Sequence, residues 1–339
     1  MADGMPFDIS VPTAFVSTGA LPPVSKMRAL INDAHARFAG LGDGAVADYI
    51  PALASADPAL FAIAVVGTDG ASVTCGECHA GFTIQSISKP FVFALVAQAL
   101  GAETARAKLG VNATGMPFDS VMAIEMGDYR ATNPMVNAGA IAATSLMPGD
   151  TAEAKWEAIL TGMSRFAGRQ LVMDEAVFAS EMATNLRNRG IAALLESYGK
   201  LGCAPDMAVE VYTRQCSVTV TATDLAKMAA TLANGGVNPL THAQVADALV
   251  VKRVLAVLAT AGLYERSGEW LYEVGLPGKS GVSGGIMTVA PGKGGLGVFS
   301  PPLDSAGNSV RASRVTKYLS DALGLNLFAS QPVSMGNDA

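Results

Sequence analysis

The clearest chemical signal in the sequence is a serine followed three positions later by a lysine, in Ser86-Ile87-Ser88-Lys89. The pair lies where extended chain passes into an apolar segment, residues 86–100, that predicts a buried helix. Residues three apart face the same side of a helix, so the Lys89 amine can reach the Ser86 hydroxyl. A lysine with a pKa lowered by burial can act as the base that a serine nucleophile needs. Free N–H groups at the helix start would stabilise the negative charge that develops.

The same motif has a structural alternative. Ser-x-x-Lys occurs by chance in many helices, where the serine caps the helix and the lysine is solvated. Ser88 competes with Ser86 as the capping residue, although no lysine follows it three residues later.

A second motif favours the chemical interpretation. Lys279-Ser280-Gly281 lies just before an apolar strand predicted over 285–289. Serine-acylating enzymes of the β-lactamase and penicillin-binding class pair Ser-x-x-Lys with a later Lys-Thr-Gly, and Ser280 keeps the hydroxyl of that threonine. An edge strand here would supply a second N–H for an oxyanion hole, whereas a glycine-rich β-turn is the structural alternative.

Other catalytic chemistries find less support. Ser283 lies in a Gly-x-Ser-x-Gly match that runs into an apparent strand, and all three histidines (His35, His79 and His242) precede it, against the order of that hydrolase fold. Cys75-x-x-Cys78-His79 has the spacing of haem attachment but lies in an apparent hairpin, and we see no export signal. With Cys203 and Cys216, we expect reduced thiols and neither a metal site nor a cofactor.

Composition narrows the class of protein. Of 339 residues, 50% are hydrophobic and 15% are charged, which favours a large folded core. A net charge of −6 and the absence of a Lys/Arg-rich run argue against nucleic-acid and membrane-surface binding. Of the longest apolar stretches, 91–100 is too short to cross a bilayer and 249–263 contains Lys252 and Arg253. We therefore expect a soluble, cytoplasmic protein.

The predicted elements form three blocks. Helix 25–39 and extended segments 61–66, 72–74 and 81–84 come first, and mainly helical signals follow over 101–265, clearest at 156–166, 174–187, 222–233 and 243–261. Strands 270–274, 285–289 and 296–300 and a helix over 310–323 complete the chain. The order predicts an α/β fold in which an antiparallel sheet, built from both chain ends and flanked by helices, carries an inserted all-helical lobe.

The domain organisation follows from these blocks. We expect an N-terminal arm (1–22), a single catalytic domain (23–325) and a loose C-terminal tail (326–339). Within the domain, residues 23–85 and 266–325 would form the sheet lobe and residues 86–265 the helical lobe.

The chain resembles the serine-dependent glutaminase family, which has a β-lactamase/D,D-peptidase-like fold, from about residue 25 to about residue 325. The matching segments are long and specific: 47–51, 85–89, 133–141, 180–181, 187–188, 232–236, 275–277, 279–282, 300–304 and 307–309. The resemblance implies hydrolysis of the side-chain amide of L-glutamine to L-glutamate and ammonia, without a cofactor, by a homodimer or homotetramer. It also implies that Ser86 is the nucleophile, that Lys89 is its base, and that the N–H groups of Ser86 and Val282 form the oxyanion hole.

The resemblance also assigns the substrate pocket. Glu181 would hold the α-ammonium of glutamine. Its α-carboxylate would be held by Asn137, Asn188 and Tyr49. Tyr212 and Tyr264 would line the reacting centre. Tyr264 is favoured over Tyr212 as the group that passes a proton to the leaving ammonia. A zwitterion with a distal amide needs such a set of one anion, several donors and a nucleophile. Glu181 and Asn188, seven residues apart, would share one helix face.

The sequence departs from the family pattern in two places. Asp119 stands where the family often has asparagine, and residues 182–185 are less polar than is common. Two other functions stay open on the sequence alone. One is a related β-lactamase or D,D-peptidase that uses Ser86, Lys89 and Lys279. The other is a non-catalytic module that binds glutamine without turning it over.

Overall fold

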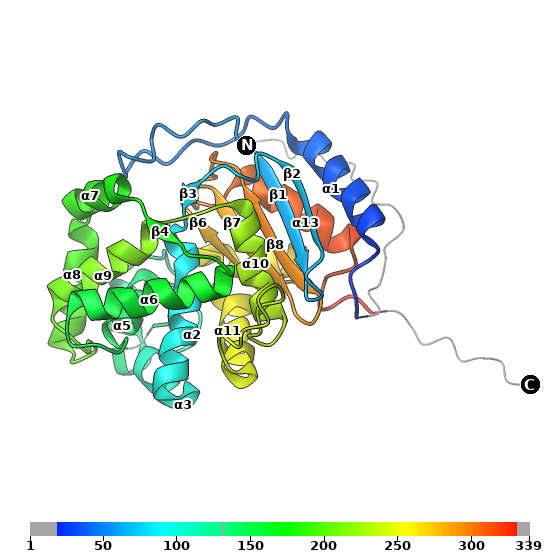
Figure 1. The fold of residues 1–339 in the computed structure, drawn as a ribbon. Helices are drawn as coiled ribbons and strands as arrows, with labels where there is room; N and C mark the ends of the chain where they lie inside the picture. Colours follow the sequence, from blue (N-terminus) through cyan, green and yellow to red (C-terminus); the bar gives the residue numbers. More distant parts are fainter. Residues whose placement is uncertain (1–18, 131, 331–339) are drawn as a thin grey trace, which may run out of the picture.

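The computed structural model describes residues 19–130 and 132–330, and it shows an α/β fold with helices on both faces of a sheet (Figure 1). The main sheet is antiparallel throughout, in the order β2-β1-β8-β7-β6. Its strands are β1 (Ala62–Gly67), β2 (Ser72–Gly76), β6 (Gly278–Gly281), β7 (Gly285–Ala290) and β8 (Gly294–Phe299).

The α-helices follow most of the predicted segments. They are α1 (Val24–Phe38), α2 (Lys89–Leu100), α3 (Ala102–Leu109), α4 (Met122–Met126), α5 (Asn137–Ser145), α6 (Ala152–Ala167), α7 (Glu175–Thr184), α8 (Leu186–Ser197), α9 (Pro205–Cys216), α10 (Ala222–Ala233), α11 (Ala248–Ala261), α12 (Ser267–Glu273) and α13 (Val310–Ala322). Short 3₁₀ helices are η1 (Gln85–Ser88), η2 (Asp128–Arg130) and η3 (Tyr264–Arg266).

Strands β1 and β8 join distant parts of the chain, since their register pairs Ala62 with Phe299 and Gly67 with Gly294. The sheet is therefore built from both chain ends, as the sequence predicts. Both strands are buried along their whole length, because helices cover both faces (Figure 1). On one face, Ile31 of α1 and Leu319 of α13 join the sheet residue Ile63 in one hydrophobic cluster.

Helix α10 covers the other face at unusually close range. A Cβ atom at Gly297 would lie 2.1 Å from the carbonyl oxygen of Ala222, and one at Gly295 would lie 2.4 Å from that of Ala226. Glycine in β8 permits this contact between backbones. The central helix and the sheet therefore form a rigid platform beside the inserted segment.

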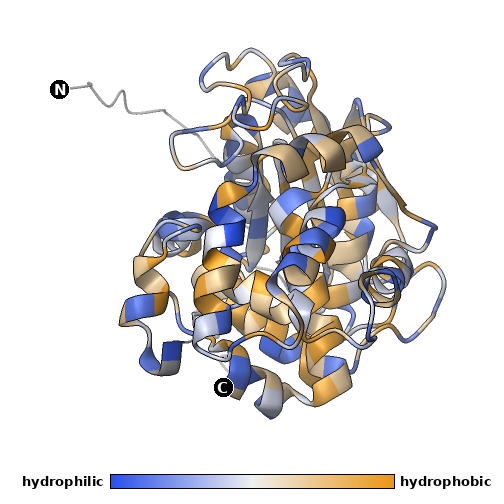
Figure 2. Ribbon diagram, turned by 90° about the vertical axis from the view of Figure 1, so that its left-hand side faces the viewer, coloured by the Kyte–Doolittle hydropathy of each residue, from blue (hydrophilic) through white to orange (hydrophobic). Residues whose placement is uncertain are grey.

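The segment between β2 and β6 is mainly helical, and Figure 2, which faces this side of the molecule, shows hydrophilic and hydrophobic residues mixed along its helices. The expectation of an all-helical lobe is nevertheless wrong. Three short strands form a second sheet in the order β3-β5-β4: β3 (Phe82–Thr83), β5 (Val218–Val220) and β4 (Val172–Met173). Strands of two or three residues are too short to leave a periodic signal in the sequence.

The strand predicted over 270–274 is also wrong, because this segment belongs to α12. Trp270 and Val274 are buried while Tyr272 is 86% exposed. That alternation resembles a strand, but positions 270 and 274 also fall on one helix face. The Trp270 indole donates to the Leu276 carbonyl oxygen at 2.8 Å, which fixes the helix against the sheet.

Among the described residues, no helix has both the length and the apolar composition needed to cross a bilayer. Most of the expected N-terminal arm and the end of the expected tail lie outside the described residues, and the domain boundaries stay a prediction.

Candidate active site

The chain enters the candidate site through a strained turn. Gln85 has φ of +49°, a left-handed conformation that is uncommon for a residue with a side chain. Such strain costs about 1–3 kcal/mol and clusters at functional sites. The Lys89 N–H donates to the Ser86 carbonyl, and side chains three apart eclipse one another in a 3₁₀ turn. Ser86 and Lys89 are therefore brought to one side of the turn, as their spacing predicts.

The structural alternative for this motif is wrong. No side-chain cap bond exists at the start of α2; instead Ser88 Oγ donates to the Gln85 carbonyl at 2.7 Å and accepts from Gln215 Nε2 at 3.2 Å. The Lys89 side chain is not solvated, since the residue is 1% exposed.

The Lys89 amine lies in an environment that favours its neutral form. Burial lowers the pKa of Lys89 from 10.5 to about 8. Nζ donates to Asn137 Oδ1 at 2.7 Å and lies 5.9 Å from the centre of the Tyr212 ring. An amine with this pKa can accept a proton near neutral pH. In its neutral form it can keep the N–H bond to Asn137 while its lone pair accepts a proton.

Asn137, the first residue of α5, connects several of the predicted site residues. Its Oδ1 accepts from Lys89 and from the Tyr212 hydroxyl, the latter at 3.2 Å. Its Nδ2 donates to Asn188 Oδ1 at 2.9 Å, and its backbone N–H donates to the Phe118 carbonyl at 2.8 Å. One amide thus joins α2, α5, α8 and α9.

Glu181 is a buried carboxylate without a full set of partners. The residue is 8% exposed, and its Oε2 has no hydrogen-bond partner among the described residues. Burial raises the pKa of Glu181 from 4.5 to about 7, against the opposing effects of the Gln85 amide and the Lys89 charge. A buried acceptor left unpaired is costly, and a cationic ligand group would satisfy it.

The expectation that Glu181 and Asn188 share one helix face is wrong. Helix α7 ends at Thr184 and α8 begins at Leu186, so the two residues lie on different helices. Asn185 lies at the break, where its side chain donates to Thr213 Oγ1 at 3.4 Å and accepts from Arg189 Nε at 3.0 Å. Such polar contacts compete with regular helix hydrogen bonds.

Tyr264 approaches Ser86 from η3. It is buried, has φ of +59°, and its hydroxyl donates to the Ser280 carbonyl at 3.2 Å. Burial raises the pKa of Tyr264 to about 12, while hydrogen bonding by Ser86 and Ser280 acts against that rise. The Phe118 ring packs 4.9 Å from the Tyr264 ring.

Residues 279–281 lie in β6, the edge strand of the sheet, and not in a glycine-rich turn. Gly281 packs closely on η1, since a Cβ atom there would lie 2.9 Å from the Ile84 carbonyl oxygen. Val282, which directly follows β6, is buried. The edge strand therefore brings the backbone at Val282 next to the turn that carries Ser86.

Tyr49 lies on the long loop that runs from α1 across to α7 and back to β1 (Figure 1), where Ala52 N donates to Ser180 Oγ at 3.3 Å. Its side chain is largely exposed, while its hydroxyl is within electrostatic reach of Tyr264, Glu181 and Asp119. Asp119 forms an ion pair with Arg187 at 3.6 Å, close to the same group of residues.

Other chemical motifs lie elsewhere or have structural partners. Ser283 Oγ donates to the Thr83 carbonyl at 2.6 Å, and His35 stacks on Phe61 at 4.5 Å between ring centres. All four cysteines are free thiols. Across residues 19–130 and 132–330, no group of three or more His, Cys, Asp or Glu side chains has an arrangement that could hold a metal ion.

Sequence reasoning gave no role to Gln85 or Phe118, although both contact the site. Gln85 precedes the predicted nucleophile, and its amide donates to Thr83 Oγ1 at 3.2 Å. Phe118 stands beside Asp119, where the sequence departs from the family pattern. Their positions near motif residues were the available signal, but neither residue type indicates chemistry by itself.

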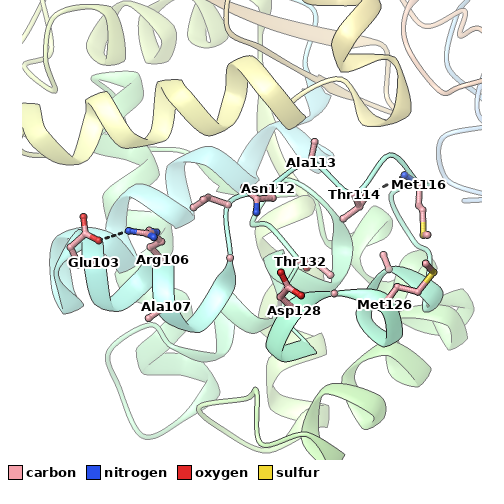
Figure 3. Close-up of a pocket in the computed structure, with 14 residues that line it drawn as sticks. Glu103, Arg106, Ala107, Asn112, Ala113, Thr114, Met116, Met126, Asp128 and Thr132 are labelled. Carbon is pink, nitrogen blue, oxygen red and sulfur yellow. Dashed lines mark hydrogen bonds and ion pairs between the residues drawn. The ribbon is translucent and has the colours of Figure 1, made fainter.

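A cavity of about 830 Å³ lies apart from this site, between α3, α4 and the loop after α3 (Figure 3). Its lining includes a Glu103–Arg106 ion pair at 3.0 Å together with Asp128 and Thr132. None of the predicted site residues lines it. The converging polar groups around Ser86, rather than this cavity, therefore define the candidate active site.

Comparisons with known proteins show which family the chain belongs to. The family model described as Glutaminase matches residues 44–328. "Glutaminase 2" of Yersinia pestis is 55% identical over 323 residues, covering 95% of each chain, and a glutaminase of Colwellia psychrerythraea is 50% identical over 91% of this chain and 99% of that relative.

Solved structures show the same relationship. The structure of the probable glutaminase ybaS has a TM-score of 0.90 at 44% identity and covers 91% of this chain and 100% of its own. A probable glutaminase from Bacillus subtilis, complexed with 6-diazo-5-oxo-L-norleucine, has a TM-score of 0.79 at 32% identity over 90% of this chain and 97% of that one. On this evidence, the chain belongs to the glutaminase family.

Proposed function

We propose that this glutaminase hydrolyses L-glutamine through a glutamyl ester on Ser86. Conversion of glutamine to glutamate follows from identities of 50–55% with curated glutaminases over most of the chain. The observation that carries the mechanism is the Lys89 amine, which is buried one 3₁₀ turn from Ser86 and has a pKa lowered to about 8. The β-lactamase-like character of the fold is part of the same proposal, supported by a Ser-x-x-Lys turn facing an edge strand with Lys-Ser-Gly.

The first half-reaction forms the ester. Ser86 Oγ attacks the side-chain amide carbon of glutamine while its proton passes to Lys89. The oxyanion accepts from the N–H groups of Ser86 and Val282. Collapse of the tetrahedral intermediate breaks the C–N bond, and the nitrogen leaves as ammonia after it receives, through Tyr264 or alternatively Tyr212, the proton that Lys89 took from Ser86. In the second half-reaction, water attacks the ester and gives a proton to the neutral Lys89, which passes it to Ser86 Oγ as the C–O bond of the ester breaks and glutamate is released.

The far end of the substrate is bound by groups already arranged for a zwitterion. Glu181 takes the α-ammonium, because its Oε2 is buried and unpartnered among the described residues. Asn137 and Asn188, joined at 2.9 Å, take the α-carboxylate together with Tyr49 at the exposed side. Glu181 also disfavours a β-lactamase or D,D-peptidase, whose acylating substrates carry no ammonium group at this position.

Ser86→Ala tests the mechanism. The variant is expected to fold normally and to release no ammonia from glutamine, whereas turnover near the wild-type rate would exclude Ser86 as the nucleophile. A second readout is mass spectrometry after treatment with 6-diazo-5-oxo-L-norleucine, the compound bound to the Bacillus subtilis relative. We expect a covalent adduct on Ser86 in the wild type and none in Ser86→Ala. Nitrocefin serves as the control substrate and is expected to remain intact.

Location and assembly stay predictions. Four free thiols favour the reducing cytoplasm, and the family resemblance favours a homodimer or homotetramer.

A further inference from the structure

Lys279 is a buried amine beside the reacting groups to which the mechanism above gives no task. The residue lies in β6 and is 0% exposed. Its Nζ donates to the Ser280 carbonyl at 3.1 Å, and the Tyr264 hydroxyl donates to the same oxygen at 3.2 Å. Nζ also lies over the Tyr264 ring, 4.1 Å from its centre. The amine therefore meets Tyr264 twice, at the ring face and through a shared acceptor.

We propose that Lys279 is a positioning residue that holds the Tyr264 phenol against Ser86 while a proton passes to the leaving ammonia. This inference rests on the acyl-enzyme mechanism proposed above. Lys279 itself touches neither the substrate nor the transferred proton in this scheme, so its effect on the rate passes through Tyr264.

Tyr264 depends on surrounding contacts to hold its conformation. It lies in a three-residue 3₁₀ helix with a left-handed backbone conformation, φ of +59°. Hydrogen bonds to the hydroxyl alone still leave the ring free to rotate about its Cβ–Cγ bond. Lys279 on the ring face and Phe118, whose ring lies 4.9 Å away, remove that freedom.

The shared acceptor is itself rigid. Ser280 pairs with Ile286 in the register of β6 and β7, and its hydroxyl donates to Asn308 Oδ1 at 2.6 Å. The Asn308 backbone N–H in turn donates to Asp304 Oδ1 at 3.0 Å. The carbonyl that orients both Tyr264 and Lys279 is therefore anchored on two sides.

The charge state of Lys279 suits this role. Burial and then the Lys89 charge lower the pKa of Lys279 well below its usual value, while Cys216 acts in the opposite direction. In either protonation state the amine can donate an N–H to the Ser280 carbonyl and lie on the face of the Tyr264 ring. The lowered pKa favours the neutral form, which is the form that repels a charged Lys89 least.

A double-mutant cycle on the full-length enzyme tests the proposal, with Lys279→Met, Tyr264→Phe and the double variant assayed for glutamate formation. We expect Lys279→Met and Tyr264→Phe each to lower kcat about 100-fold, within the range for a lost proton-transfer group. KM should change little. Because Lys279 acts through Tyr264, the double variant should be within about twofold of the slower single variant.

Lys155→Met is the matched control. Lys155 is 4% exposed, and its Nζ donates to the carbonyls of Ser145 and Met147 at 3.0 and 2.5 Å, at the opposite end of α5 from Asn137. We expect the Lys155→Met variant to have a lower melting temperature but an unchanged kcat per folded molecule. It therefore measures the effect of losing a buried lysine that has only a structural role.

Two results would overturn the proposal: a Lys279→Met variant with kcat near wild type, or losses that multiply in the double variant. Should Lys279→Met fail to fold, Lys279→Leu takes its place in the cycle, because leucine also lacks an N–H donor. Lys279→Gln keeps an N–H donor and should lose less kcat than either apolar variant. Ser86→Ala is assayed alongside. Turnover in that variant would refute the acyl-enzyme mechanism itself, which is a different outcome from a failed cycle.

Discussion

Two buried carboxylates, Glu181 in the candidate active site and Asp224 at the start of α10, meet opposite environments. Asp224 accepts from Arg169 Nε and Nη2 at 2.9 and 2.6 Å and from the N–H and hydroxyl of Thr221 at 3.0 and 2.9 Å. Burial by itself would raise the pKa of Asp224, but the hydrogen bonds from Arg169 and Thr221 outweigh it and lower that pKa. Glu181 keeps one oxygen unpartnered among the described residues, and burial raises its pKa to about 7.

The two environments indicate a structural role for Asp224 and a role in substrate binding for Glu181. Asp224 completes a capping box that starts the helix packed against the sheet, so its charge is satisfied within the protein. Within the described part of the chain, Glu181 and Lys89 are buried and form no ion pair with each other or with another side chain. In the proposed mechanism, the substrate ammonium and the Ser86 proton satisfy them. The candidate active site therefore bears the free-energy cost of burying ionisable groups without ion pairs, whereas the platform around α10 does not.

Of the substitutions that test this comparison, Lys89→Met is expected to lower activity most. Methionine fills the volume of the lysine but cannot accept the Ser86 proton, so we expect kcat/KM to fall by about 10⁴-fold or more. The melting temperature should hold or rise, because a buried amine is replaced by an apolar side chain. Ammonia release and a thermal melt measure the two quantities; retained activity would show that Lys89 is not the base.

The pH dependence comes next. In the proposed mechanism, substrate binding needs ionised Glu181 and catalysis needs neutral Lys89, whose pKa values lie at about 7 and about 8. We expect kcat/KM to rise by about two orders of magnitude or more between about pH 6 and about pH 8. A rate that is flat over this range would contradict the assigned protonation states.

The stability of the folded state should respond to pH with opposite signs at the two carboxylates. Glu181 has a raised folded pKa, so its contribution to the free energy of unfolding falls as pH rises from about 4.5 to about 7. Asp224 has a lowered pKa, so its contribution is present above its ordinary pKa of 3.8 and is lost as pH falls through the lower folded value. Melting curves of Glu181→Gln and Asp224→Asn across this range separate the two.

Glu181→Gln should lower kcat/KM by about 100-fold, mostly through KM, since removing one member of a desolvated charge pair costs about 2–5 kcal/mol. The variant should be at least as stable as the wild type at pH 8, where the buried carboxylate is ionised. Titration with glutamine by calorimetry measures the lost affinity, and an unchanged affinity would remove Glu181 from the ammonium site.

Asp224→Asn carries the smallest effect on activity. We expect a loss of about 2 kcal/mol in unfolding free energy, from a weakened cap and lost hydrogen bonds to charged Arg169. Activity per folded molecule should stay near wild type. Denaturant unfolding combined with an activity assay checks both, and a selective loss of kcat would show that α10 contributes to the chemistry.

The sequence predicted regular elements well where a periodic pattern ran for several turns, and failed where it did not. Helix α10 covers the predicted range, and β7 and β8 lie within a few residues of theirs. At α12, the positions of Trp270, Tyr272 and Val274 fit a strand and a helix equally, and packing of Trp270 decided between them. Strand β3 lies within the extended segment predicted over 81–84, whereas β4 and β5 were not predicted, because these short strands exist only through pairing with distant segments.

The sequence alone determined the chemical parts: a serine and a lysine three apart, a later Lys-Ser-Gly, and the segments that carry Asn137, Glu181 and Asn188. These motifs can be identified from the sequence because they depend only on the spacing of residues along the chain and on the period of hydrophobic residues. Only the tertiary structure decided which groups meet. The left-handed turn at Gln85 forms only in the folded chain. Distant segments bury Lys89, Lys279 and Glu181, whose Oε2 has no hydrogen-bond partner among the described residues. Because these segments exclude water, they shift the pKa values of all three side chains.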